Sequence, residues 1–337
     1  MINDHDVKDT ALSAYAPASI GNVSLGFDLL GAALAPIDGS LLGDQVELSQ
    51  AECFSLEVKG AFADKLPPDP DSNIVSRCYQ HFIRVLADKR GDQGELPAVS
   101  MILHKHLPIG SGLGSSASSI VAALYGLNQF YADLLDIKGF SDNELLLMMG
   151  ELEGQISGSV HYDNVAPCFL GGLTLMAEHK ERVALQLPVF ENWYWVVCYS
   201  GTSVSTAAAR EILPKQVSMQ DTIKFGRQLG VFVDALYRKD EKLAAAMMTD
   251  VLAEPYRKSL LPRFDESRSY TQQNGALAFG ISGSGPTVFA VCNDLAQAQN
   301  IQQWLNEHYK QNDSGFSHIC QIDQRGAAIN ALSKNKI

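Results

Sequence analysis

Residues 108–118 read PIGSGLGSSAS and lead directly into an apolar-periodic segment at 120–131. Glycine has no Cβ and adopts positive φ, so Gly110, Gly112 and Gly114 let the backbone approach a ligand closely. The first turn of the helix that follows leaves amide donors unpaired, and the helix dipole adds partial positive charge there. Such a loop is typical of a phosphate-binding site.

Three interpretations of this loop compete. A Walker loop needs a lysine after its second glycine, and no lysine occurs between His106 and Asp136. Residues 112–117 fit the looser dinucleotide pattern G-x-G-x-x-A, but the acidic residue that should close a second strand falls in a segment with helix-end character. The third interpretation is a plain turn that packs a helix onto a sheet. Ser115 and Ser116 favour phosphate binding, because a Walker loop places its magnesium-binding hydroxyl there.

Two further segments extend the pattern to a family. The run at 108–118 resembles the second signature of the GHMP kinases, named for galactokinase, homoserine kinase, mevalonate kinase and phosphomevalonate kinase. Residues 16–31, APASIGNVSLGFDLLG, are similar to the first signature in its homoserine kinase form, and residues 280–287, GISGSGPT, to the third. The resemblance implies an ATP-dependent kinase of a small-molecule hydroxyl, that of L-homoserine in threonine synthesis.

Length and composition agree with a small-molecule enzyme. A chain of 337 residues allows two packed lobes or one large domain. The net charge of -12 and the absence of lysine or arginine runs argue against nucleic acid or an anionic membrane as the partner. No apolar run is long enough to span a bilayer, and the polar start has no signal-peptide character, so we expect a cytoplasmic protein. The six cysteines form no C-x-x-C pair and are expected to be buried, reduced thiols.

The order of predicted elements indicates the fold class. Residues 1–13 are polar and aperiodic, which predicts a flexible tail. Strands are predicted at residues 45–48, 54–58, 99–103 and 193–199. Strands and helices alternate without a regular βαβ repeat, so we expect an α+β fold of two lobes with the active cleft between them. The resemblance implies the same arrangement, with an N-terminal ATP-binding domain at 14–185 and a C-terminal domain at 186–337.

Capping residues mark three helices. Asn73 is a predicted N-cap for an amphipathic helix that starts at residue 74. A capping box opens at Ser141, ahead of a helix over 145–153. Ser205 or Thr206 is the expected N-cap of a third helix, with Arg210 one turn inside it.

Two pairs of residues are candidates for metal binding. Glu151 and Glu153 could form a solvated helix face, the usual position of helical glutamates. The resemblance selects Glu153 as the magnesium ligand that partners Ser116. His104 and His106 share one face of a predicted strand, but no third ligand is close in sequence, which favours surface histidines.

Polar residues at 161–164 precede an apolar run and suggest a pocket. Asp163 and Asn164 fit an ordinary Asx turn equally well. In the family, an aspartate here is either a catalytic base or a substrate anchor. The lysine-bearing members place that lysine near Ser19 of this chain, so a lysine partner for a catalytic aspartate is missing.

The acceptor is inferred from charge. Homoserine is a zwitterion and needs arginine near its carboxylate and aspartate near its ammonium. Arg210, Arg257, Asp28 and Asp163 provide both charges. The alternatives are a GHMP kinase that acts on mevalonate or a sugar, and a nucleotide-binding regulator without phosphotransfer.

The resemblance implies the following site residues. The catalytic set is Asp28, Asp163 and Asn164. The substrate-binding set is Asn22, Asp28, His161, Asp163, Thr206, Arg210 and Arg257. The nucleotide-binding set is Asn73, Pro108, Ile109, Gly110, Ser111, Gly112, Leu113, Gly114, Ser115, Ser116, Ala117 and Ser118. Ser116 and Glu153 would hold Mg²⁺, ATP would be the phosphoryl donor, and relatives suggest a homodimer.

Overall fold

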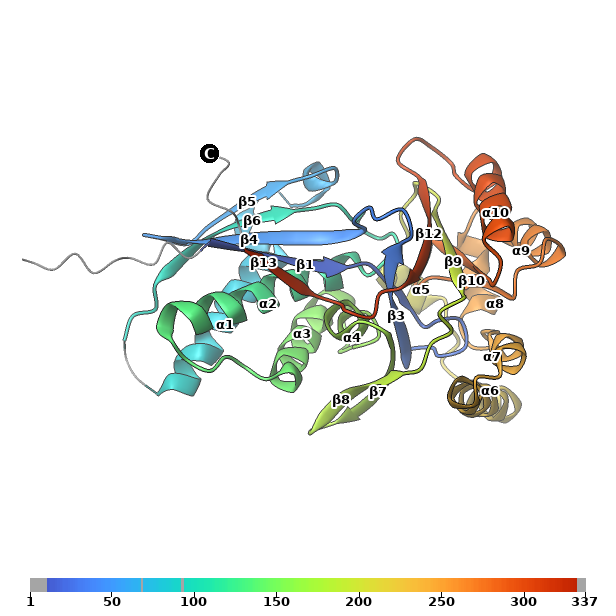
Figure 1. Ribbon diagram of the computed structural model, residues 1–337, viewed down its shortest axis with the longest axis horizontal. Helices are drawn as coiled ribbons and strands as arrows, with labels where there is room; N and C mark the ends of the chain where they lie inside the picture. The colour runs from blue at the N-terminus through green and yellow to red at the C-terminus, as the bar shows by residue number, and fades with distance from the viewer. Residues whose placement is uncertain (1–10, 68, 92–93, 332–337) are drawn as a thin grey trace, which may run out of the picture.

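Two sheets frame the computed structural model, which describes residues 11–67, 69–91 and 94–331 (Figure 1). The first sheet has the strand order β13-β1-β4-β6-β5, and only its β5–β6 pair is parallel. Its strands are β1 (Ala11–Pro17), β4 (Gly43–Ala51), β5 (Ser55–Lys59), β6 (Ala98–His104) and β13 (Ala328–Ala331).

The second sheet has the order β10-β11-β9-β12-β3-β7-β8, and all its pairs are antiparallel. A short strand, β2, pairs with β3 beside this path. The strands are β2 (Ser19–Gly21), β3 (Leu30–Pro36), β7 (Leu173–His179), β8 (Arg182–Leu187), β9 (Tyr194–Tyr199), β10 (Ala278–Ile281), β11 (Val288–Cys292) and β12 (Phe316–Ile322).

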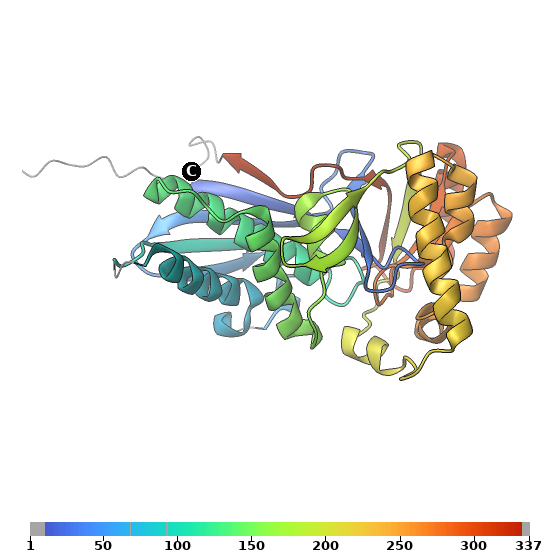
Figure 2. The same cartoon turned by 90° about the horizontal axis from the view of Figure 1, so that it is seen from below.

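The helices divide between the two sheets, as Figures 1 and 2 show. Helices α1 to α4 pack together beside the first sheet, and α2 contacts β1 and β4 directly. Helices α6 to α10 lie on the side of the second sheet, where α10 contacts β9, β11 and β12. The helices are α1 (Ile74–Arg90), α2 (Ser115–Leu135), α3 (Asp142–Ser157), α4 (Val165–Leu170), α5 (Thr206–Glu211), α6 (Met219–Arg238), α7 (Glu241–Met247), α8 (Glu254–Arg257), α9 (Phe264–Gln273) and α10 (Leu295–His308); η1 (Ala63–Lys65), η2 (Pro70–Ser72) and η3 (Lys258–Leu260) are single 3-10 turns. The two largely antiparallel sheets, each with its own helices, confirm the predicted two-lobed α+β fold.

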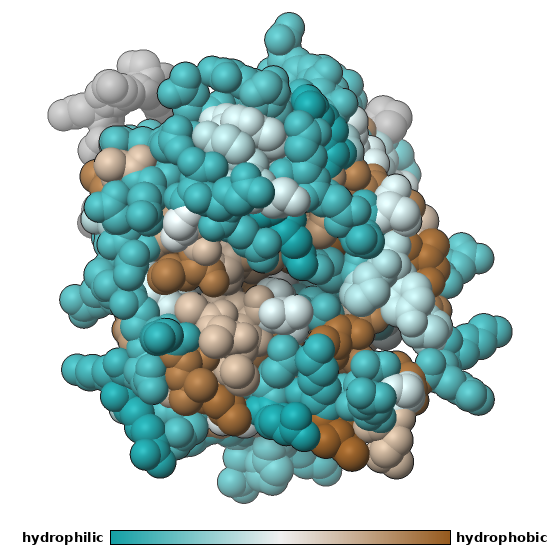
Figure 3. All heavy atoms as spheres, turned by 90° about the vertical axis from the view of Figure 1, so that its right-hand side faces the viewer, coloured by the Kyte–Doolittle hydropathy of each residue, from teal (hydrophilic) through white to brown (hydrophobic). Residues whose placement is uncertain are grey.

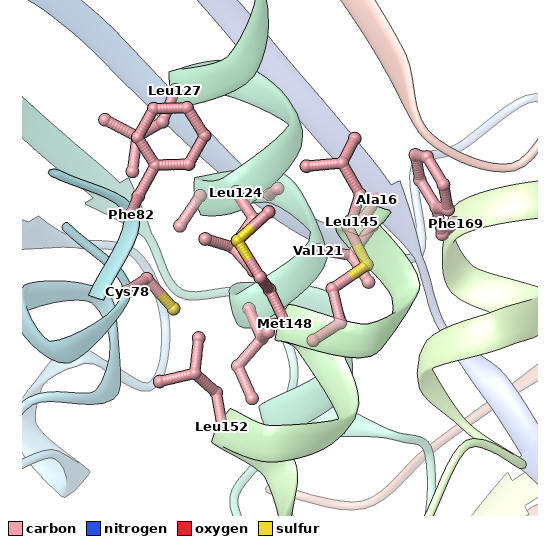
Figure 4. Packing of buried hydrophobic residues seen from close by; sticks show 14 of the residues in the cluster. Ala16, Cys78, Phe82, Val121, Leu124, Leu127, Leu145, Met148, Leu152 and Phe169 are labelled. Atoms are coloured by element: carbon pink, nitrogen blue, oxygen red, sulfur yellow. The ribbon is translucent and has the colours of Figure 1, made fainter. Parts of the chain in front are cut away.

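The first core lies between α1, α2, α3 and the first sheet. Figure 4 shows Cys78 and Phe82 of α1, Leu124 of α2 and Met148 of α3 packed against one another. Helix α2 is buried along nearly its whole length, as expected for a helix enclosed by other elements rather than lying on a surface. This packing holds α2 in place, and the glycine-rich loop leads directly into its first turn.

The predicted caps are present. The Asn73 Oδ1 accepts the Val75 N–H at 2.9 Å, so α1 starts where the sequence indicated. Ser141 and Glu144 form the capping box of α3. Ser205 is the N-cap of α5, and Thr206 is the first residue of that helix.

The chain does not divide cleanly at residue 185. That position lies inside β8, strands β2 and β3 near the N-terminus belong to the second sheet, and β13 near the C-terminus returns to the first. The connections between lobes therefore cross the molecule several times, which a linear division of the sequence misses. Residues 1–10 of the predicted tail lie outside the described residues, whereas residues 11–13 belong to β1 and pair with β4.

Surface features correct one expectation. Cys53 is exposed, and the other five cysteines are buried. Within the described residues, no helix has the length and apolar character needed to cross a membrane. The face in Figure 3 is mostly hydrophilic, with apolar residues gathered in its middle and lower parts.

Candidate active site

A cleft of about 830 Å³ brings most of the predicted site residues together. Its wall combines the glycine-rich loop, the first turns of α1, α2 and α5, the end of α3, and the third glycine motif. The predicted residues that line it are Asn22, Asp28, Asn73, Pro108, Ile109, Gly110, Ser111, Gly112, Gly114, Ser115, Ser116, Glu153, His161, Asp163, Asn164, Thr206, Arg210 and Arg257.

Three of the predicted nucleotide residues lie away from the cleft. Leu113 and Ala117 are fully buried in the hydrophobic cores. The Ser118 hydroxyl donates to the Ala16 carbonyl at 2.7 Å and accepts the Asp44 N–H at 2.8 Å. These side chains point into the packing around α2, so they hold the loop in place and do not face a ligand.

The glycines of the loop are required by close approach. Gly112 has a φ of 81°, and a Cβ there would lie 2.4 Å from the Ser282 carbonyl oxygen. Gly114 has a φ of 64°, and its Cβ would lie 2.2 Å from the Ser19 Oγ. Gly114 also caps α2 without a side-chain hydrogen bond, so no side chain of the cap competes for the first-turn amides. The loop is thus held between the first and third signatures, and its Leu113 N–H is bonded internally to Ser111 Oγ at 3.3 Å.

Ser116 in the first turn of α2 and Glu153 near the end of α3 bring two side-chain oxygens together that could bind a metal ion. The Ser116 hydroxyl donates to Glu153 Oε1 at 2.8 Å. Burial raises the pKa of Glu153 above its ordinary value, and the Ser116 hydrogen bond partly offsets this. Glu151 points outward instead, with 61% of its side chain exposed beside His81. Glu153 therefore faces the start of α2, whereas Glu151 does not.

The opposite end of the cleft carries opposite charges. Arg210 forms a bidentate pair with Asp28, with contacts of 2.9 and 3.1 Å. The His161 Nδ1 lies 3.8 Å from Asp28 Oδ2, and burial lowers the pKa of His161. Asn22 accepts the Asp28 N–H at 2.9 Å, which fixes the backbone of the first signature.

Arg257 is buried, and two nitrogens of its guanidinium bond to carbonyl groups. Its Nε donates to the Ala209 carbonyl at 2.9 Å and its Nη1 to the Gly283 carbonyl at 3.0 Å. The Phe27 ring has both cations close to it, Arg257 at 5.2 Å and Arg210 at 5.6 Å from its centroid. Phe27 was not predicted, although its position directly before Asp28 was a signal for it.

Asp163 and Asn164 lie where the first signature meets the glycine loop. Burial, together with the Asp28 and Glu153 charges, raises the pKa of Asp163 to about 7. The Ser19 hydroxyl donates to Asn164 Oδ1 at 2.9 Å. Ser19 itself is buried and does not line the cleft, and its hydroxyl bonds to Asn164 and not to Asp163. Asn164 precedes α4 without a side-chain cap bond, and Asp163 and Asn164 both line the cleft.

A buried ion pair beneath the loop was missed. Lys105 and Asp44 are almost completely buried and in contact, and Lys105 Nζ also donates to the Ser115 carbonyl at 2.9 Å. Asp44 accepts the Ser119 hydroxyl at 2.6 Å. Residues 99, 101 and 103 of β6 are buried, and Lys105 is the next residue in the same alternating series. The alternation of a strand could therefore have shown that Lys105 points inward.

The cleft lining also includes a group of apolar residues that were not predicted. They are Phe62, Leu66, Pro67, Ile74 and Leu103. Asn73 and Arg77 add polar groups to this part of the lining. An apolar slot with a few polar groups is typical of a site for a planar base.

Comparisons with known proteins agree with this geometry. The family model for the GHMP kinases N terminal domain matches residues 73–172, and the model for the GHMP kinases C terminal domain matches residues 232–311. The chain is 32% identical to a homoserine kinase from Cytophaga hutchinsonii, with a TM-score of 0.83, covering 98% of this chain and 100% of that chain.

Two more distant structures share the fold. The chain is 14% identical to a mevalonate kinase from Methanococcus jannaschii, covering 94% of this chain and 99% of that chain, with a TM-score of 0.66. It is 16% identical to a mevalonate kinase from L. major, covering 96% and 99%, with a TM-score of 0.63. At these identities the similarity concerns the fold alone.

Proposed function

We propose, because this chain belongs to the GHMP kinase family, that it transfers the γ-phosphoryl group of ATP to the hydroxyl of L-homoserine and forms O-phospho-L-homoserine. The observation that carries this proposal is the charge pattern at one end of the cleft. Arg210 and Arg257 both approach the Phe27 ring there, and Asp28 and Asp163 line the same cleft. Mevalonate and neutral sugars have no ammonium group to match the carboxylates.

The Asp28–Arg210 pair can exchange partners with a zwitterion. When an amino acid enters, its ammonium replaces the arginine beside Asp28, and its carboxylate replaces the aspartate beside Arg210. Each charge keeps an opposite partner, so the exchange avoids leaving an unpaired charge in a partly buried site. Arg257 would add a second donor for the carboxylate through its Nη2. Its Nε and Nη1 are bonded to carbonyls, and these bonds hold the guanidinium in place.

The other end of the cleft fits ATP and magnesium. The loop at 108–116 would hold the phosphates through its amides, and the apolar slot would hold the base. Ser116 and Glu153 would hold Mg²⁺, which accepts one or two carboxylates together with water and phosphate oxygens. When bound, the ion would neutralise charge that develops on the phosphates. The buried, raised-pKa carboxyl of Glu153 fits such a role, because a cation would stabilise its ionised form.

Catalysis by this chain would rest mainly on positioning. A loose phosphoryl-transfer transition state makes little demand for early removal of the hydroxyl proton. Asp163 would therefore act chiefly as an anchor for the substrate ammonium. Asn164, held by Ser19, would orient the hydroxyl beside the glycine loop.

Arg210→Ala and Arg257→Ala are each expected to raise the KM for homoserine while leaving the KM for ATP unchanged. Loss of one partner of a buried charge pair costs roughly 2 to 5 kcal/mol. The cost of Arg210→Ala should lie at the lower end of this range, because 34% of the Arg210 side chain is exposed. Steady-state kinetics with each substrate varied in turn measures both constants.

Arg238→Ala is the matched control, because Arg238 forms only an exposed ion pair with Asp234 on α6. Its kinetic constants should equal those of the wild type. An unchanged homoserine KM in both cleft variants would refute carboxylate recognition by this pair.

A further inference from the structure

Helix α8 is a single turn, Glu254–Arg257, that brings Arg257 to the cleft. One helical turn is not stable alone, because nucleation fixes several residues for one hydrogen bond. The position of Arg257 therefore depends on what holds this turn from outside the cleft. Two sets of contacts do so, and none of the three residues that make them lines the cleft.

The first set comes from Asp250. Its Oδ1 accepts the N–H groups of Leu252 and Ala253 at 2.7 and 2.9 Å, and its Oδ2 accepts the Glu254 N–H at 2.9 Å. This single carboxylate fixes the backbone that enters α8. Burial and the Arg210 charge lower the pKa of Arg257, whereas the Asp250 charge acts in the opposite direction.

The second set is an ion pair between α8 and α9. Glu254 is 6% exposed and is in contact with Arg268 Nη2. The Arg268 guanidinium lies 5.1 Å from the ring centroid of Phe264 and 5.8 Å from that of Phe279. These rings belong to α9 and β10, so the ion pair ties α8 to two firmly packed elements.

At the other end, Arg257 joins the parts that would bind the acceptor. Its bond to the Ala209 carbonyl reaches α5 directly before Arg210. Its bond to the Gly283 carbonyl reaches the third motif, and the same carbonyl accepts Asn22 Nδ2 at 3.1 Å. A shift of α8 would therefore move the arginine and loosen both contacts.

We propose that Asp250 and the Glu254–Arg268 ion pair are positioning residues that hold Arg257 for recognition of the acceptor's carboxylate. The proposal rests on the proposed function, since it assigns Arg257 to that carboxylate. Removal of the Glu254 charge loosens the link between α8 and α9, so that Arg257 is held less firmly by the Asp250 contacts and by its own two carbonyl bonds. The glycine loop and the Ser116–Glu153 pair are untouched, so nucleotide binding stays intact.

The test is the kinetics of Glu254→Gln, which keeps the side-chain volume and removes the charge. The KM for homoserine should rise about tenfold, which corresponds to about 1.4 kcal/mol, while the KM for ATP stays within error. Arg268→Ala should have the same effect through the more exposed partner, and it serves as the second variant if Glu254→Gln does not fold. Arg268→Lys should recover much of the loss, because it restores a positive charge.

Asp265→Asn is the matched control. It breaks the exposed Lys258–Asp265 pair, which also joins the segment after α8 to α9. Its homoserine KM should equal the wild-type value. A raised KM in this control would overturn the proposal, because any weakened link between these elements would then suffice.

The midpoint of thermal unfolding, measured beside the homoserine KM, separates a purely structural role of the ion pair from a positioning role. If Glu254→Gln and Arg268→Ala lower the midpoint but leave the homoserine KM unchanged, the ion pair serves stability only and the proposal is wrong. Failure of the proposed function would appear in the wild type, as ADP release that does not depend on homoserine. The same variants would then be measured with the acceptor that the wild type does use, where a raised acceptor KM supports positioning and an unchanged one overturns it.

Discussion

Glu153→Ala is expected to lower kcat by roughly 10²-fold or more, because a bound magnesium ion supplies several kcal/mol of charge stabilisation. Glu153 is the carboxylate that faces the glycine loop through Ser116. The apparent affinity for Mg²⁺ should fall as well, so raising the magnesium concentration should recover part of the activity. The measurement is kcat as a function of Mg²⁺ concentration at saturating ATP and homoserine.

Two companion variants show whether the effect belongs to this carboxylate. Glu153→Gln keeps the volume and should be nearly as impaired, which excludes a simple packing defect. Glu151→Ala removes an exposed glutamate two residues earlier on the same helix and should behave like the wild type. Near-normal turnover by Glu153→Ala at ordinary magnesium would reassign the ligand to Glu151.

Asp163→Asn is expected to raise the homoserine KM strongly, with a smaller fall in kcat. Asparagine keeps a hydrogen-bonding group of the same shape but loses the charge that would bind an ammonium. A general base would instead contribute roughly 10² to 10⁴-fold to the rate, lost from kcat alone. A collapse of kcat by several orders with an unaltered KM would show that Asp163 is the base.

The pH dependence of this variant gives a second reading. Because the pKa of Asp163 is raised to about 7 in the folded protein, its ionised form is disfavoured there. The stability that it contributes is present below its unfolded pKa and is lost as the pH rises towards about 7. Asp163→Asn should remove this part of the pH dependence, as measured by thermal midpoints of the ligand-free protein. In the wild type, the homoserine KM should rise as the pH falls below about 7, and the variant should lack that rise.

The sequence predicted the parts of the site that depend on short local patterns. The glycine loop with its helix, the Asn73 cap and the Ser141 capping box each follow from residues within a few positions of one another, whereas Glu153 was selected by the family resemblance. The family resemblance also assigned roles to residues far apart in the chain, such as Asp28 in the first signature and Arg210 outside all three. The structure places these two in direct contact.

What was missed depends on contacts between distant segments. The Lys105–Asp44 pair joins neighbouring strands beneath the loop, and its residues are charged groups at inward strand positions. The placement of β3 in the second sheet and β13 in the first could not be read from periodicity, because periodicity shows which face of a strand is buried and not which sheet it joins. The inward packing of Ala117 and Ser118 was missed for a similar reason. Both look like loop residues in the motif but already belong to a buried helix.

The central claim, that the acceptor is a zwitterionic amino acid, is tested most directly by ADP release with magnesium and three acceptors: L-homoserine, mevalonate and galactose. A site whose buried charges match the substrate rejects analogues that leave those charges unpaired. We expect kcat/KM for homoserine to exceed the other two by roughly 10²-fold or more, with no turnover when magnesium is removed. Equal or faster turnover of mevalonate or galactose would contradict the account.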